Sequence, residues 1–361
     1  MKPIFEETRY GAIHAKNRIV MAPMSRNRAT YDGVPTPMMA TYYAQRANAG
    51  LIVAEGMQPD VIGQGFMNSP GIHNEAQIAG WQQVTEAVHR EGGKIVAQLM
   101  HAGRIGHPAL YPSAHQSIAP SAIAADGQAF TPEGPVNFPT PRAMTEEDIA
   151  LTIQGFAQAA KNAIEAGFDG VEIHAGNGFL LHQFMASNTN QREDAYGGSI
   201  ENRIRFTLEV THAVIEAIGA ERTGIRLSPS NPYNDIVEVD TPELYRTLIT
   251  QLPTLAFIHI MEACDRESTT LIRELTSSPL ILNPHQTPES GVVTGQIAEQ
   301  VLQAKLCDGV AIGALFLANP DLMHRLKVGG PFNELDPNTL YGGDQRGYTD
   351  YPTLEDILET A

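Results

Sequence analysis

Cysteine is scarce in this chain of 361 residues, which contains only Cys264 and Cys307. Their separation matches no metal-binding spacing, and a single disulfide would contribute little to the stability of so long a chain. We therefore predict two reduced, buried thiols and no metal centre built on cysteine.

Basic residues and long apolar runs are also in short supply. Lys and Arg number 24 against 41 Asp and Glu, and the formal net charge is −17. Nucleic acid and anionic membrane surfaces require a cationic face, so we expect neither as a partner. No apolar run approaches the ~20 residues that span a bilayer, and the opening MKPIFEETRYGAI lacks the apolar core of a signal peptide. These features predict a cytoplasmic protein.

Several motifs that indicate a particular reaction are absent. The chain has no GxSxG nucleophile elbow, no Walker loop and no GxGxxG after an apolar strand. A hydrolase of the nucleophile-elbow type, a P-loop enzyme and a Rossmann dinucleotide site are therefore not indicated.

What the chain does contain is a repeated alternation of short apolar runs and longer amphipathic stretches. The apolar runs are residues 18–23, 51–56, 94–101, 170–175, 223–229, 256–262, 279–284 and 309–314. Runs that are apolar throughout are typical of parallel strands buried on both faces. The stretches between them, such as 145–167 and 199–219, have apolar residues at helical spacing and end in glycine. We therefore predict one (β/α)8 TIM barrel domain over residues 1–361 rather than a doubly wound sheet.

One segment breaks this alternation. Residues 102–142 follow the third predicted strand and are dense in Pro, Gly and Ser. Long loops of this kind usually carry function. We predict a lid-like insertion that caps the mouth of the barrel.

The loops that follow the strands build the active sites of such barrels, so the residues just past each strand are the candidates. They are Ser25, Gly56, Gln58, Gln98, His101, His174, Asn177, Arg226, Glu262, Asn283, His285, Gly313 and Ala314. Amides, imidazoles and hydroxyls suit hydrogen bonding to the edge of a flat heterocycle. The set lacks the paired acids of a glycosidase and the oxygen cluster of a magnesium site. His174 and His182 stand on either side of a turn in a spacing that does not suit zinc, and we predict no metal.

Structural roles stay open for some of these residues. Gln98 and Arg226 could be buried groups satisfied by backbone carbonyls. A guanidinium buried without a partner is costly, however, which favours an anionic or acceptor-rich ligand at Arg226. Asn177 could simply cap a helix, and His182 is better explained by helix packing than by chemistry.

Several long stretches are specific enough to compare with known proteins. They are NRIVMAPMSRNRA, PTPMMATYYAQRANAGLIVAEG, IVAQLMHAGR, EAGFDGVEIHAGNGFLLHQFM, REDAYGGSIENR, GIRLSP, LANPDL and YGGDQRGYTDYPTL. Together they resemble the old yellow enzyme family of flavin-dependent ene-reductases over nearly the whole chain. The resemblance implies a (β/α)8 barrel with FMN at its mouth, NAD(P)H as reductant, and an activated C=C bond or a nitro compound as substrate.

The resemblance also implies which residues bind the isoalloxazine ring. Arg226 would lie near N1 and the C2 oxygen, where negative charge gathers on reduction, and a fixed cation there stabilises the reduced ring. The other ring contacts would be Pro23, Met24, Ser25, Gly56 and Gln98.

At the catalytic positions the chain both matches the family and departs from it. The residues that correspond to His174 and Asn177 donate hydrogen bonds to the carbonyl oxygen of an enone. Two residues further on, the family usually has a tyrosine that protonates the α-carbon, and this chain has Phe179. A benzene ring has no proton to give, so the acid would be water, another side chain such as Tyr348, or none.

A second departure concerns the flavin phosphate. The family has a Gly-rich loop after the seventh strand and an arginine after the eighth. This chain has Asn283, Pro284 and His285 in the first place, and Gly313 followed by Ala314 in the second. A charge-assisted hydrogen bond contributes roughly 1.5 to 3 kcal/mol, so loss of the arginine predicts weaker binding of FMN, which His285 could partly restore.

Three hypotheses follow from this combination. The first is an FMN-dependent ene-reductase or nitro-reductase that takes its proton from solvent. The second is an isomerase on a conjugated carbonyl compound, with no flavin, weakly held flavin or an altered cofactor. The third is a silent barrel that binds a small planar ligand.

Overall fold

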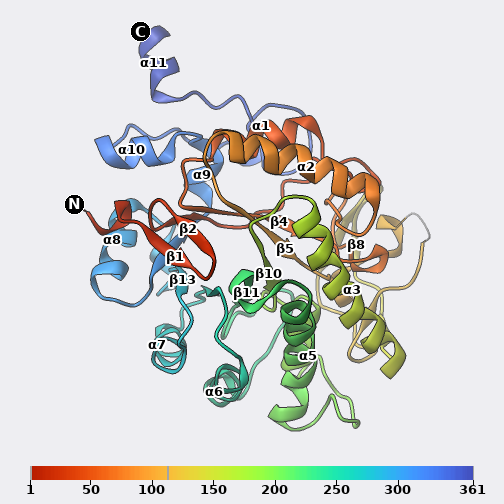
Figure 1. Cartoon of the computed structure of the whole chain (residues 1–361). Helices are drawn as coiled ribbons and strands as arrows, with labels where there is room; N and C mark the ends of the chain where they lie inside the picture. Colours follow the sequence, from red (N-terminus) through yellow and green to blue (C-terminus); the bar gives the residue numbers. More distant parts are fainter. Residues whose placement is uncertain (1, 112–113, 361) are drawn as a thin grey trace.

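The computed structural model describes residues 2–111 and 114–360, and its centre is a closed barrel of parallel strands (Figure 1). In the order in which they pair, the strands are β3 (Ile19–Met21), β4 (Leu51–Met57), β5 (Ile95–Leu99), β10 (Gly170–His174), β11 (Thr223–Leu227), β12 (Phe257–Met261), β13 (Leu280–Asn283) and β14 (Gly309–Ile312). Each overlaps one of the eight apolar runs identified in the sequence. The prediction of a (β/α)8 barrel is confirmed.

Helices surround the barrel in Figure 1. They are α1 (Pro37–Gln45), α2 (Glu75–Arg90), α3 (Glu146–Glu165), α4 (Leu180–Met185), α5 (Ile200–Ile218), α6 (Thr241–Gln251), α7 (Arg266–Leu275), α8 (Gly295–Gln303), α9 (Ala314–Ala318), α10 (Leu322–Val328) and α11 (Leu354–Thr360), with 3₁₀ turns η1 (Pro3–Phe5), η2 (Val61–Gly63), η5 (Ala220–Arg222), η6 (Pro288–Ser290) and η7 (Pro337–Thr339). Local sequence marks their ends. Thr145 and Asp148 form a capping box at the start of α3, and Gly219, with φ of 90°, ends α5. No helix within residues 2–111 and 114–360 has the length and apolarity of a membrane span.

A hairpin covers the N-terminal end of the barrel. β1 (Thr8–Tyr10) pairs antiparallel with β2 (Ile13–Ala15), and Figure 1 shows the hairpin across that end. Tyr10 packs edge-on against Phe257, with ring centroids 6.0 Å apart. A Cβ atom at Gly309 would meet the Tyr10 hydroxyl oxygen at 1.8 Å, so glycine makes room for this packing. The hairpin leaves the C-terminal ends of the strands as the place for a site, as is usual in this fold.

The segment 102–142 lies between β5 and α3 and has structure of its own. It contains η3 (Gly103–Ile105), η4 (Pro108–Leu110), β6 (Ile118–Ala119) and the hairpin of β7 (Gln128–Thr131) with β8 (Gly134–Asn137), and β6 pairs with β9 (Arg142–Ala143). We call this segment the insertion.

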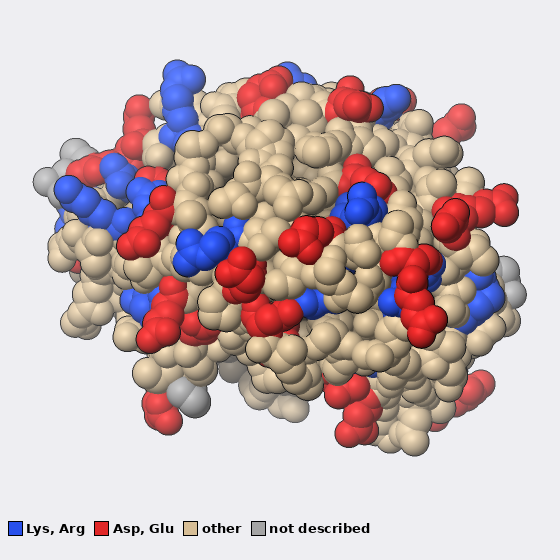
Figure 2. Space-filling view, turned by 90° about the horizontal axis from the view of Figure 1, so that it is seen from below, with Lys and Arg blue, Asp and Glu red and all other residues tan. Residues whose placement is uncertain are grey.

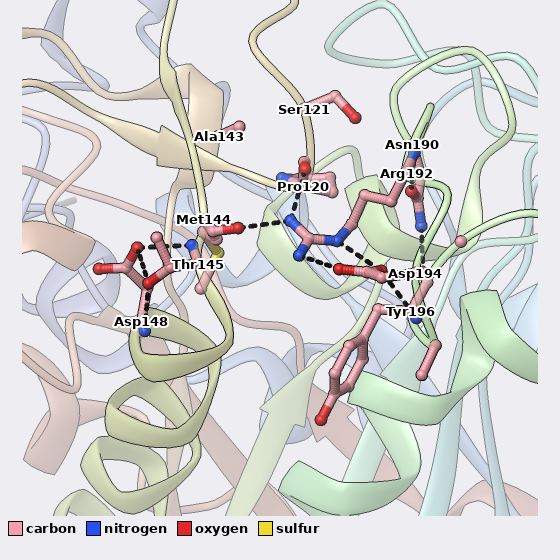
Figure 3. A network of polar contacts seen from close by, with 12 residues as sticks. Pro120, Ser121, Ala143, Met144, Thr145, Asp148, Asn190, Arg192, Asp194 and Tyr196 are labelled. Atoms are coloured by element: carbon pink, nitrogen blue, oxygen red, sulfur yellow. Dashed lines mark hydrogen bonds and ion pairs between the residues drawn. The ribbon is translucent and has the colours of Figure 1, made fainter.

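Arg192, in the loop between α4 and α5, fastens the base of the insertion. Its guanidinium donates to the carbonyl oxygens of Pro120 and Met144, at 2.9 and 2.5 Å, and forms an ion pair with Asp194 (Figure 3). The residues that follow β6 and β9 are therefore held by a single cation. Because of this anchor, the base of the insertion is fixed relative to the barrel.

The surface is acidic but not uniformly so. Figure 2 shows one face on which Asp and Glu side chains are spread out, with Lys and Arg side chains among them. Both cysteines are free, as predicted, but only Cys307 is buried, and burial raises the pKa of its thiol to about 12. The prediction that Cys264 is buried is wrong, because it lies in an exposed turn after β12 with φ of 62°.

Candidate active site

A buried polar cluster lies inside the barrel on neighbouring strands. Gln98 on β5 donates from Nε2 to Oε1 of Glu172 on β10 over 2.8 Å. The other carboxylate oxygen, Oε2, lies 2.7 Å from Nδ1 of His259 on β12. All three side chains are buried. Gln98 is predicted from the sequence and Glu172 and His259 are not, although all three residues stand within strands.

Arg226 on β11 belongs to the same layer of the barrel. It pairs in register with His174 on one side and with His259 on the other. Arg226 is 5% exposed, and its Nε is buried without a hydrogen-bond partner among the described residues. Burial lowers the pKa of Arg226, and the nearby Glu172 carboxylate partly offsets that effect. A buried cation in this situation requires an acceptor from a ligand.

His174 ends β10 beside Arg226. Burial and the neighbouring Arg226 cation hold the pKa of His174 well below its ordinary value, so the imidazole is neutral. Its Nδ1 is buried without a partner in the described part of the chain. The single proton is therefore best placed on Nε2, because an N–H at Nδ1 would have no acceptor. The side chain can serve as a neutral hydrogen-bond donor.

Asn177 is held in place by the loop that follows β11. Its backbone N–H donates to Ser228 Oγ over 2.6 Å, and its Oδ1 accepts from Asn231 Nδ2 over 2.9 Å. Its φ of 52° lies in the left-handed region, which asparagine tolerates. The N-cap of α4 is Phe179, not Asn177, so the alternative of a simple helix cap is wrong. With Oδ1 engaged, Nδ2 is the atom that can donate to a ligand.

The loops after β3 and β14 meet at the mouth of the barrel. Pro23, Met24 and Ser25 are partly exposed there. A Cβ atom at Gly313 would lie 3.3 Å from Sδ of Met24, and one at Gly56 would lie 2.8 Å from Sδ of Met100. Glycine at these two positions therefore lets the neighbouring thioethers approach the backbone.

Phe179 forms part of an apolar wall beside His174. The two ring centroids are 5.1 Å apart in an edge-on arrangement. Phe179 also packs with Met100 and with residues of the insertion, among them Ile105 and Ala125. The insertion therefore reaches the same wall, and the residue beside the imidazole has no group that can donate a proton.

Tyr348 does not lie in this site. Its ring stacks on that of Tyr42, with centroids 4.1 Å apart, and the Arg28 guanidinium lies 4.2 Å from its ring centroid. Tyr348 is fully buried, and its hydroxyl has no partner among the described residues. This packing speaks against the expectation that Tyr348 replaces the missing acid. The sequence could not show it, because the contacts join residues far apart in the chain.

The chain is similar to known proteins over nearly its whole length. A profile described as "NADH:flavin oxidoreductase / NADH oxidase family" matches residues 3–333. The solved old yellow enzyme homologue from Zymomonas mobilis is 39% identical, with a TM-score of 0.92 over 97% of this chain and 99% of that one. The chain belongs to the old yellow enzyme family. Morphinone reductase superposes with a TM-score of 0.92 at 38% identity, over 99% of this chain and 98% of that one.

Relatives from eukaryotes show the same likeness. A probable flavin mononucleotide-dependent alkene reductase of Leishmania infantum is 40% identical over 349 residues, which is 94% of each chain. The 12-oxophytodienoate reductase 1 of Oryza sativa subsp. japonica is 37% identical over 366 residues, 99% of this chain and 94% of the relative. As a member of this family, the protein is a flavin oxidoreductase that uses FMN and NAD(P)H.

The residues at the mouth fit the flavin ring of an old yellow enzyme. The Arg226 guanidinium needs an acceptor, and the flavin edge at N1 and the C2 oxygen would supply one. With Nε2 of Gln98 bonded to Glu172, its carbonyl oxygen is available to the N–H of the pyrimidine edge.

The residues expected to bind the flavin phosphate offer few free donors and little positive charge. The Asn283 amide donates to the Ala311 carbonyl, and the His285 backbone N–H donates to the Glu262 carboxylate over 2.9 Å. Arg266, which is close by in the chain, forms an ion pair with the same Glu262. Ala314 begins the short helix α9. Among these residues, only His285 can offer a positive charge that no carboxylate already holds.

His182 holds the turn that contains Asn177 and does not take part in the reaction proposed for this site. Its Nδ1 accepts from the backbone N–H of Gly178 over 3.0 Å, and its Nε2 lies 2.8 Å from Oε1 of Glu238. Burial acts to raise the pKa of Glu238, but hydrogen bonds from His182, Ser230 and Tyr245 outweigh it and hold the pKa below its ordinary value. This buried pair ties the turn that contains Asn177 to the loop before α6.

Proposed function

We propose that this protein reduces the C=C bond of small α,β-unsaturated carbonyl compounds, and reduces nitro compounds of similar size, at a site formed by His174, Asn177 and Arg226. FMN, reduced by NAD(P)H, supplies the hydride when it is bound. The observation that supports the proposal most strongly is the buried Arg226, whose Nε has no hydrogen-bond partner within residues 2–111 and 114–360, in register with the neutral imidazole of His174. Relatives named as an alkene reductase and as 12-oxophytodienoate reductases support this substrate class.

His174 and Asn177 would bind the carbonyl oxygen of the substrate. Both are neutral donors; hydrogen bonds from Asn177 to Ser228 and from Asn231 to Asn177 hold the amide, and the His174 ring packs edge-on against Phe179. Donors aimed at an oxygen on which negative charge develops stabilise the transition state more than the ground state. This arrangement withdraws electrons from the C=C bond, so that the β-carbon accepts the hydride.

Gln98 and Arg226 would hold the cofactor. The guanidinium adds a fixed positive charge where the reduced ring carries negative charge, and the amide fixes the orientation of the pyrimidine edge. Both side chains stand on barrel strands rather than on loops, which keeps them rigid.

The proton for the α-carbon would come from solvent. Phe179 has no acidic proton, and Tyr348 is packed elsewhere. Protonation of the α-carbon by solvent is slower than protonation by a positioned acid, typically by a factor of about 10² to 10⁴. The enzyme therefore keeps hydride transfer and loses part of the rate of substrate reduction.

Anaerobic kinetics test this assignment. Replacing His174 or Asn177 with alanine should slow reoxidation by cyclohexenone about 10²- to 10³-fold, as removal of an oxyanion-hole donor does. Reoxidation by ferricyanide, which needs no carbonyl polarisation, should be unchanged and serves as the control. If both substitutions leave the cyclohexenone rate unchanged, the carbonyl does not bind there.

A second candidate is isomerisation of a conjugated carbonyl compound. Phe179 favours it, because an enolate that is formed by hydride addition and is not protonated promptly has time to rotate about its new single bond. Return of a hydride from the β-carbon to the cofactor would then restore the C=C bond with the other geometry. Product analysis separates the two: isomerisation forms product without net consumption of NAD(P)H, whereas reduction consumes one equivalent.

A further inference from the structure

Glu172 lies at the centre of the buried cluster below the proposed cofactor site, and neither the family resemblance nor the site above assigns it a role. It is fully buried. Its two carboxylate oxygens are engaged on opposite sides, one by Gln98 at 2.8 Å and the other by His259 at 2.7 Å. These contacts link β5, β10 and β12, with β11 and Arg226 between the last two.

The charges of the cluster are few and can be assigned. A carboxylate oxygen only accepts, so Nδ1 of His259 carries the proton, and its Nε2 is buried without a partner in the described residues. Burial lowers the pKa of His259, which keeps its ring neutral. Burial also keeps His174 neutral. The cluster therefore contains one anion, Glu172. Burial lowers the pKa of the nearby cation Arg226, and the charge of Glu172 acts to raise it.

The hydrogen bond to Glu172 fixes the orientation of the Gln98 amide. A carboxamide has one donor end and one acceptor end. Because Nε2 of Gln98 donates to Glu172, the amide cannot flip without placing its oxygen against a carboxylate oxygen. Glu172 thereby selects the rotamer in which the Gln98 carbonyl is available to the cofactor.

We propose that Glu172 is a positioning residue that fixes the Gln98 amide and partly neutralises Arg226, so that it lowers the reduction potential of the bound flavin. The inference rests on the proposed placement of FMN over Gln98 and Arg226. Its physical basis is that interactions between charges are strong in a buried site, where water does not screen them. A carboxylate below the ring disfavours the extra negative charge of the reduced ring, and Arg226 favours it.

Binding of oxidised and reduced FMN to the apoprotein tests this directly. Glu172→Gln keeps the shape of the side chain and removes its negative charge, so the positive charge of Arg226 is no longer partly neutralised. The ratio of the dissociation constants for oxidised and reduced FMN should rise about tenfold, which equals about 30 mV for two electrons, toward a more positive potential. An unchanged or lower ratio would overturn the proposal.

Two further variants separate charge from packing. Asp169→Asn is the matched control, because Asp169 is a partly buried carboxylate just before β10, at the opposite end of the barrel, where it pairs with Lys94 and accepts from the backbone N–H of Ile95, and it should leave the ratio unchanged. Glu172→Asp keeps the charge but shortens the side chain. It should weaken both forms of FMN and keep the ratio within about threefold of wild type. If Glu172→Gln does not fold, the test depends on Glu172→Asp alone. In that case wild-type affinity for both forms of FMN, or a tenfold higher ratio of dissociation constants, contradicts the proposal.

Arg226→Gln, which removes the positive charge and keeps a polar side chain, distinguishes this inference from the placement of the cofactor. If it lowers the potential while Glu172→Gln has no effect, the role of Glu172 is refuted and the site stands. If neither substitution changes FMN binding, the ring does not lie over these residues and both proposals fail.

Discussion

Replacing Phe179 with tyrosine restores a phenol at the position where the family usually has its acid. The Phe179 ring centroid lies 5.1 Å from that of His174, so a para-hydroxyl would stand beside the bound carbonyl compound. A positioned general acid contributes about 10² to 10⁴ in rate. We therefore expect faster reoxidation by cyclohexenone by up to that factor, and an unchanged rate of reduction by NAD(P)H, because that step needs no proton from this residue.

The substitution has a stability penalty that the structure allows us to bound. Phe179 is 5% exposed and packs in an apolar cluster. A buried hydroxyl without a partner costs about 1 to 3 kcal/mol. The total stability of a folded protein is about 5 to 15 kcal/mol. Phe179→Tyr should therefore fold, with a lower melting temperature.

Anaerobic stopped-flow measurement of the two half-reactions is the assay. Phe66→Tyr is a suitable control, because its ring lies 6.2 Å from that of Phe179 and it adds a phenol to the same cluster away from His174. The reasoning is refuted if Phe179→Tyr retains FMN and fold but reoxidises with cyclohexenone no faster than wild type.

Two other substitutions test separate parts of the account. Ala314→Arg should tighten oxidised FMN about tenfold to a hundredfold, the equivalent of roughly 1.5 to 3 kcal/mol, if the phosphate lies at the start of α9; an unaltered titration contradicts that placement. Glu238→Gln should lower the melting temperature at neutral pH. The pKa of Glu238 is below its ordinary value of 4.5 in the folded state, so its contribution is present above pH 4.5 and is lost as the pH falls through the folded pKa. The difference in melting temperature between wild type and Glu238→Gln should therefore shrink below pH 4.5, and a constant difference would show that the charge of Glu238 does not matter.

The barrel was readable from the sequence because its strands are buried on both faces. Residues 309–314, GVAIGA, are apolar at every position, and in residues 170–175 only Glu172 and His174 are polar. Amphipathic segments do not show this pattern. The position of a polar residue at the end of such a strand then places it at the mouth. This is why His174 and Arg226 could both be named as site candidates, whereas their adjacency came only from the register of the strands.

Glu172 and His259 are not predicted from the sequence for a related reason. Each lies within a run that is apolar overall, although Glu172 stands two residues before His174 and therefore on the same face of β10. That spacing of two was the signal that could have found it. The supports of Asn177, namely Ser228 and Asn231, had no local signal, because they depend on how two loops meet in space.

The central claim is that FMN lies over Gln98 and Arg226 with the substrate carbonyl between the flavin and the pair His174 and Asn177. A structure of the FMN-loaded protein with a bound enone measures this directly. The account predicts the carbonyl oxygen about 3 Å from a side-chain nitrogen of each residue of that pair, with the Arg226 guanidinium at the N1 edge of the ring. A flavin bound elsewhere, or an enone oxygen turned away from His174 and Asn177, would contradict it.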